Sequence, residues 1–170
     1  MKTWKFAILL PVTTAFLIIG CKDQKETAES KISGSLINNS ECKSLKSGDL
    51  KAGIADTLSC VDYTYDASNR RVIMKHINAG FNCCPVSISC EVSTNNDTII
   101  IREKEQEQAC NCNCLFDLDI ELEGVGQNNY QVRFIEPYAA GQEGLIFEMD
   151  LTLNNEGEYC VVRKWYPWGE

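Results

Sequence analysis

The stretch Ala109–Glu123, ACNCNCLFDLDIELE, decides the fold. Cysteine and apolar residues alternate in it with mostly polar ones, and they occupy the even positions: Cys110, Cys112, Cys114, Phe116, Leu118, Ile120 and Leu122. Successive side chains of a β-strand point to opposite faces, so the pattern predicts a strand with one buried and one hydrated face. The three cysteines are then expected on the buried face, about 7 Å from one to the next.

Shorter alternating stretches fill most of the chain on both sides of this strand, separated by turn-forming residues. The other expected strands are Val61–Tyr65, Arg70–Ile77, Val86–Val92, Thr98–Arg102, Tyr130–Phe134, Leu145–Leu153 and Tyr159–Tyr166. No long amphipathic helical pattern interrupts them. About eight strands at short spacing predict an all-β fold, either an antiparallel β-sandwich or a partly open barrel.

The first 20 residues have the pattern of a secretory signal peptide. Lys2 and Lys5 precede the apolar run Phe6–Ile19, whose 14 residues are too few to span a bilayer comfortably. The junction Ile18-Ile19-Gly20-Cys21 resembles the lipobox of bacterial lipoproteins. This resemblance implies that residues 1–20 are removed and that Cys21 is acylated, for example with palmitate, so that the lipid membrane is a partner.

The segment after Cys21 is polar and is expected to be a flexible tether, over residues 21–40, to a single domain over residues 41–170. Its first residues, Lys22–Glu26, resemble the charged surface-export signals of Bacteroidetes lipoproteins. The expected location is therefore the outer membrane, on its periplasmic or its surface side.

The charge of the chain bears on its partners. The sequence has 16 basic and 24 acidic residues, a net charge of −8. Removal of residues 1–20 takes away Lys2 and Lys5 and no acid, which leaves 14 basic residues and a net charge of −10. Such an acidic protein is not expected to bind nucleic acid.

The cysteines fit an exported protein. Beyond Cys21 there are nine, all of them disulfide candidates: Cys42, Cys60, Cys83, Cys84, Cys90, Cys110, Cys112, Cys114 and Cys160. An oxidising compartment favours disulfides, and an odd number leaves at least one thiol unless a metal holds some of them. By strand parity Cys84 and Cys90 are expected to face the 110–114 cysteines, whereas Cys83 points away unless Pro85 breaks the pleat.

A metal site is the alternative use of these cysteines. Its ligands would be drawn from Cys84, Cys110, Cys112 and Cys114, with His76 as an extra ligand, and the ion would be zinc or copper. A flat C-x-C-x-C strand spreads its sulfur atoms too widely for one ion, so disulfides are preferred and no cofactor is expected.

His76 is the only histidine; it is expected to be a structural or surface residue, and the alternative is the base of a Cys–His nucleophile pair. A nucleophile–base pair also needs a third group that orients the base, and no residue pattern identifies one. Phosphate loops and hydrolase or dinucleotide motifs are absent from the sequence. The prediction is therefore a protein without enzymatic activity.

The aromatic end of the chain, Trp165-Tyr166-Pro167-Trp168, is expected to pack over an open end of the sandwich. The alternative is a stacking platform for a protein or glycan ligand.

Three motifs, His76–Pro85 (HINAGFNCCP), Cys110–Leu118 (CNCNCLFDL) and Tyr166-Pro167-Trp168, together resemble a group of small cysteine-rich Bacteroidetes lipoproteins. The resemblance covers most of the chain after the signal. It implies the envelope location and the sandwich, and it implies no activity. The expected function is a lipid-anchored binding or structural module of the cell envelope.

Overall fold

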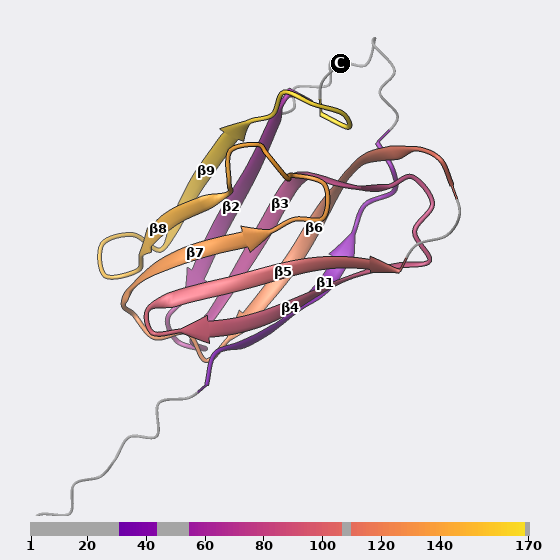
Figure 1. The fold of residues 1–170 in the computed structure, drawn as a ribbon. Helices are drawn as coiled ribbons and strands as arrows, with labels where there is room; N and C mark the ends of the chain where they lie inside the picture. Colours follow the sequence, from indigo (N-terminus) through magenta and orange to yellow (C-terminus); the bar gives the residue numbers. More distant parts are fainter. Residues whose placement is uncertain (1–30, 44–54, 107–109, 169–170) are drawn as a thin grey trace, which may run out of the picture.

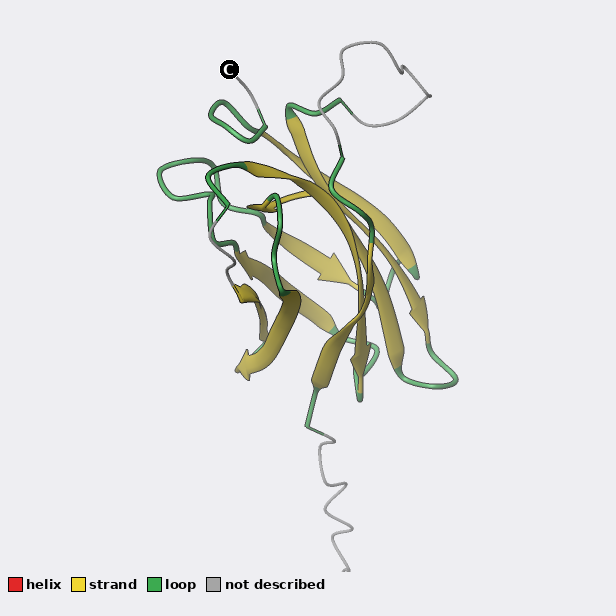
Figure 2. Ribbon diagram, turned by 90° about the vertical axis from the view of Figure 1, so that its right-hand side faces the viewer, coloured by secondary structure: helices red, strands yellow, loops and turns green. Residues whose placement is uncertain are grey.

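The computed structural model describes residues 31–43, 55–106 and 110–168. These residues form nine strands joined by loops and turns, and they contain no helix (Figure 2). A helix with the length and apolar character needed to cross a membrane is accordingly not found among them. The expected signal peptide, the acylated Cys21 and the first part of the tether lie outside the described residues.

The strands form two sheets. The first has the order β1-β6-β3-β2-β9 and the second the order β4-β5-β7-β8. Their bounds are β1 Ser33–Asn39, β2 Leu58–Asp66, β3 Arg71–Asn82, β4 Ser87–Asn95, β5 Thr98–Gln106, β6 Asn113–Glu123, β7 Asn129–Ile135, β8 Ile146–Asp150 and β9 Glu156–Val162. One sheet lies across the other (Figure 1), so the fold is a β-sandwich and not a closed barrel.

One strand pair departs from the expected antiparallel arrangement. All hydrogen-bonded neighbours are antiparallel except β5 and β7, which are parallel. The chain leaves β5 for β6 in the other sheet before it returns as β7, and this crossover reverses the relative direction of the two strands.

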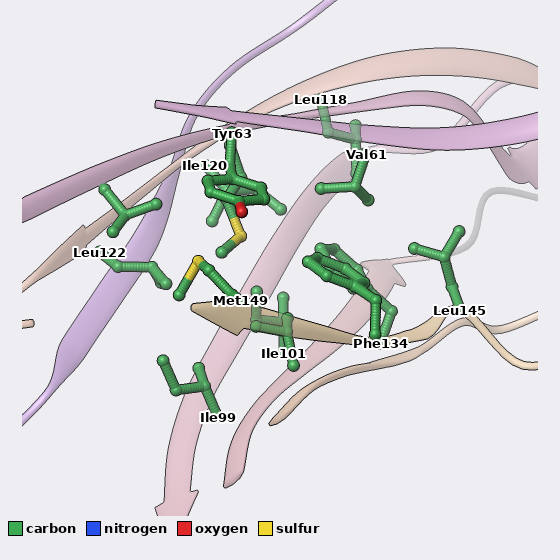
Figure 3. Close-up of a cluster of buried hydrophobic side chains, with 14 of the residues drawn as sticks. Val61, Tyr63, Ile99, Ile101, Leu118, Ile120, Leu122, Phe134, Leu145 and Met149 are labelled. Atoms are coloured by element: carbon green, nitrogen blue, oxygen red, sulfur yellow. The ribbon is translucent and has the colours of Figure 1, made fainter. Parts of the chain in front are cut away.

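The core lies between the two sheets, and β6 is central to it. The inward row of β6, with Leu118, Ile120 and Leu122, faces Ile101 of β5 and Met149 of β8 (Figure 3). All five side chains have no solvent-exposed surface. The alternation at 116–122 therefore predicted the buried row correctly, whereas the cysteine part of the stretch differs. Because β6 begins at Asn113, Cys110 and Cys112 are exposed and only Cys114 is buried.

The domain begins earlier than expected. Strand β1 pairs with β6 from Ser33 to Asn39, so residues placed in the tether belong to the first sheet. The boundary at Glu41 is wrong because β1 is a half-exposed edge strand. Its sequence, SGSLINN, has too few apolar residues to show an alternation.

The described residues contain four disulfides, which confirms a disulfide-stapled fold. The bridges are Cys42–Cys114, Cys60–Cys160, Cys83–Cys112 and Cys84–Cys110. Cys90 is free, so its expected pairing is wrong, and it is the thiol that the odd number leaves over. Cys83 does not point away: residues 83 and 84 form a bend after β3, where strand parity no longer applies, and both reach the segment before β6.

Candidate functional site

Toward one end of the sandwich, the inward rows of five strands include polar side chains. On β2, β3 and β5 these are residues within the strand, and on β7 and β9 they follow its last residue. We call these side chains the buried polar cluster: Ser59, His76, Glu103, Glu136 and Arg163.

The cluster is one connected hydrogen-bond network. His76 lies at its centre, with Nε2 2.9 Å from the hydroxyl of Ser59 and Nδ1 2.6 Å from Glu103 Oε1. The guanidinium of Arg163 pairs with the carboxylate of Glu136 through Nη2, and the same nitrogen lies 3.4 Å from Ser59 Oγ. Both sheets contribute, so the network joins them across the core.

The position of Arg163 is fixed from outside the cluster as well. Its Nη1 donates to the backbone carbonyl of Glu143 at 2.7 Å. Its guanidinium lies 5.0 Å from the centre of the Trp168 ring, and the indole Nε1 of Trp168 donates to the carbonyl of Asn78 at 2.5 Å. A cation against an aromatic face is attracted by the ring quadrupole.

The charges of the cluster balance when His76 is protonated. The side chains of His76, Glu103 and Arg163 are fully buried, and that of Glu136 is 2% exposed. Burial lowers the pKa of His76, but the charge and hydrogen bond of Glu103, together with the charge of Glu136, outweigh burial and raise it above its ordinary value. Burial raises the pKa of Glu136. Two cations then face two carboxylates, as a dry interior requires.

The order Ser59–His76–Glu103 has the geometry of a nucleophile, a base and an orienting acid. Glu103 is the third group that the sequence did not identify. Its signal was its parity with Ile99 and Ile101 on the inward row of β5. However, Ser59 and His76 have no exposed surface, so no substrate reaches this hydroxyl in the conformation described. The arrangement links the two sheets through buried hydrogen bonds and an ion pair.

His76, Glu103 and Glu136 also offer three ligand atoms within 4.8 Å of one another. Glu103 Oε2 and Glu136 Oε1 are buried and have no hydrogen-bond partner among the described residues. Even so, Arg163 already neutralises Glu136, and a divalent ion would leave an excess positive charge in the core. A proton on His76 balances the cluster, so the residues fit a proton better than a metal.

The cluster predicts that stability depends on pH. The pKa of His76 is raised in the folded protein, so its proton stabilises the fold fully below the ordinary pKa of 6.5. This contribution is lost as the pH rises through the folded-state pKa, and the raised pKa of Glu136 acts in the same direction. We expect the thermal midpoint to fall as the pH rises above about 6.5, the ordinary pKa of histidine. The fall should be much smaller in His76→Gln; an equal slope in both proteins would contradict the assignment.

The cysteine set proposed for a metal does not form a metal site. Cys84, Cys110, Cys112 and Cys114 are all in disulfides, so none offers a thiolate. His76, the fifth member, bonds to Ser59 and Glu103 in the core instead.

The aromatic end of the chain divides into a buried and an exposed part. Trp168 is buried and packs on Gly80, where an added Cβ would lie 2.6 Å from the indole ring. Trp165 and Tyr166 are about half exposed, at 54% and 50%, and the hydroxyl of Tyr166 donates to the carbonyl of Asn113 at 2.6 Å. The expected packing role is therefore confirmed for Trp168.

An open cleft lies at the opposite end of the sandwich, where the chain enters β1. Its volume is about 680 Å³, and three turns line it together with the residues just before β1. We call it the tether-end cleft; it is lined by Lys31, Ile32, Arg70, Thr94, Asn96, Asp97, Gly124, Gly126, Asn128 and Tyr130. Loops at one end of a sandwich are a common place for a binding site. Sequence patterns did not predict this cleft, because the turns that meet there are far apart in the chain.

Comparison with known proteins adds no family to these observations. No family model, no curated protein and no solved structure matches the chain.

Proposed function

We propose that this protein is a non-enzymatic, lipid-anchored module of the bacterial cell envelope that binds a ligand in its tether-end cleft. The observation that carries the location is the pairing of eight cysteines into four disulfides. Such bridges persist in oxidising compartments and are rare in the cytosol. The lipobox-like junction before Cys21 and the apolar run before it support export and acylation.

The binding role is supported by the contrast between the two ends of the sandwich. The buried polar cluster is closed, with Ser59 and His76 fully buried. The tether-end cleft is open and large enough for a ligand of drug or saccharide size. Binding at this cleft, and not chemistry at the cluster, is the activity that the geometry favours.

Acylation is tested by labelling cells that express the full chain with an alkyne fatty acid. The chain is expected to take up the label and to fractionate with membranes, and Cys21→Ser is expected to lose the label. Cys90→Ser is the matched control, because Cys90 is the free thiol of the described part and should not affect labelling. Labelling that survives Cys21→Ser, or no labelling of the parent chain, would overturn the lipid anchor.

The disulfides predict the thiol count of the purified protein. Under denaturing, non-reducing conditions one reactive thiol is expected, from Cys90, because Cys21 is blocked by acylation and the other cysteines are paired. The Cys90→Ser protein should give no thiol. Several reactive thiols in the parent protein would show that the bridges do not form in the cell.

A further inference from the structure

The charge of the tether-end cleft is opposite to that of the protein. The chain has a net charge of −8, but the charged groups lining the cleft are Lys31, Arg70 and a single acid, Asp97. None of the three forms an ion pair with another described residue. Two cations without acidic partners in an open cleft attract an anionic group.

Arg70 is held in place at the cleft. It adopts a positive φ of 52°, and its carbonyl accepts a 2.9 Å hydrogen bond from the backbone N–H of Val125. Its Nη2 donates to the carbonyl of Gly124 at 3.0 Å. These two bonds clamp the β2–β3 turn to the β6–β7 turn. Because a guanidinium has five N–H donors, the remaining donors can meet a ligand at little further entropic cost.

The cleft is too large for a simple anion and is lined by neutral polar groups as well. Its volume of about 680 Å³ lies in the range of sites for drug-sized ligands. The amides of Asn96 and Asn128 and the hydroxyl of Thr94 can both donate and accept hydrogen bonds. Several such groups beside two cations match a molecule that has many hydroxyls and one acidic group.

We infer that the tether-end cleft binds an acidic saccharide, with Arg70 and Lys31 at the acidic group and the asparagine amides at the hydroxyls. This inference rests on the proposed binding function and names its ligand class. The sugar is either free or the headgroup of a glycolipid. A headgroup is within reach if Cys21 is acylated, because the ten steps from Cys21 to Lys31 span at most about 35 Å.

Calorimetric titration of the full-length protein, purified in detergent, tests the inference. The soluble probes are glucuronate and neutral glucose; the lipid probes are mixed micelles with a glucuronosyl or a glucosyl diacylglycerol. Saturable binding is expected for the acidic member of a pair and not for its neutral match. Preference for free glucuronate or for the glycolipid identifies the source, and either result supports the inference.

Two variants locate the binding. Arg70→Gln is expected to weaken it about tenfold, the effect of losing a charge-assisted hydrogen bond. Gly126→Leu should abolish binding, because a Cβ at Gly126 would lie 3.1 Å from Asn128 Nδ2 and 3.8 Å from Arg70 Nη2, inside the cleft. Arg133→Gln is the matched control, since Arg133 is an exposed cation of β7 that does not line the cleft.

The inference is overturned if neither acidic probe gives saturable binding, if glucose binds as well as glucuronate, or if Arg133→Gln weakens binding as much as Arg70→Gln. These results are independent of fatty-acid labelling. If the chain is labelled but does not bind acidic sugar, the proposed lipid anchor is supported and the proposed ligand is wrong. An unchanged thermal midpoint for each variant shows that it remains folded.

Discussion

Replacing Arg163 by methionine is expected to lower the free energy of unfolding by about 3–5 kcal/mol, the cost of breaking a buried ion pair by removing one partner. Methionine has a similar length but leaves the carboxylate of Glu136 buried at 2% exposure without its cation. It also removes the hydrogen bond to the carbonyl of Glu143 and the contact with Trp168. Denaturant unfolding under non-reducing conditions measures the loss.

Two further variants make this result specific to the cluster. Lys164→Met removes a cation from the next, exposed position and should change stability by less than about 0.5 kcal/mol. Combining Arg163→Met with Glu136→Gln should cost less than Arg163→Met alone, because no uncompensated charge remains. If Arg163→Met costs no more than the Lys164 control, the two sheets do not depend on this ion pair.

The second large effect is expected from the bridge between β2 and β9. Changing both Cys60 and Cys160 to alanine should destabilise the protein by about 2–5 kcal/mol. The two residues lie directly opposite each other in the β2–β9 pairing and are 100 residues apart in the chain. Without the bridge, the unfolded chain gains conformational freedom, and the edge strand β9 is held by hydrogen bonds and packing alone.

The control for this pair is Cys90→Ala, which breaks no bridge and truncates only a half-buried side chain on β4. The shift in the urea or guanidinium midpoint of the double variant should clearly exceed that of the control. A double variant as stable as the parent would mean that the three remaining bridges already confine the unfolded chain.

The sequence predicted the strands well where their inward rows are apolar. Leu118, Ile120 and Leu122 show the period of two that a half-buried strand requires, and they lie in the core. The same reasoning missed β1, whose single aliphatic inward residue, Leu36, sets up no alternation. It also missed the parallel β5–β7 pair, because the order of strands within a sheet depends on contacts between distant segments.

Sequence periodicity did not predict the buried polar cluster, although its residues follow the same alternation as the core. Ser59, Glu103 and Arg163 each continue the parity of apolar neighbours on their strands, so the alternation did contain a signal. Glu103 was expected in a charged loop and Arg163 in a strand, but neither was expected in the core, since charged side chains are rarely buried without partners. The partners come from five different strands, and only the assembled sandwich brings them together. The disulfide partners were undetermined for the same reason.

The Cys42–Cys114 bridge limits how far the chain can be pulled away from the first sheet. A pull on the chain ahead of Ser33 loads the hydrogen bonds between β1 and β6, which can break one after another from that end. Peeling would then reach Cys42, where a covalent link to Cys114 transfers the load to β6, the next strand of the sheet. If the chain is anchored at Cys21, as we propose, tension can then open the first strand while the Cys42–Cys114 bridge keeps the rest of the sandwich folded.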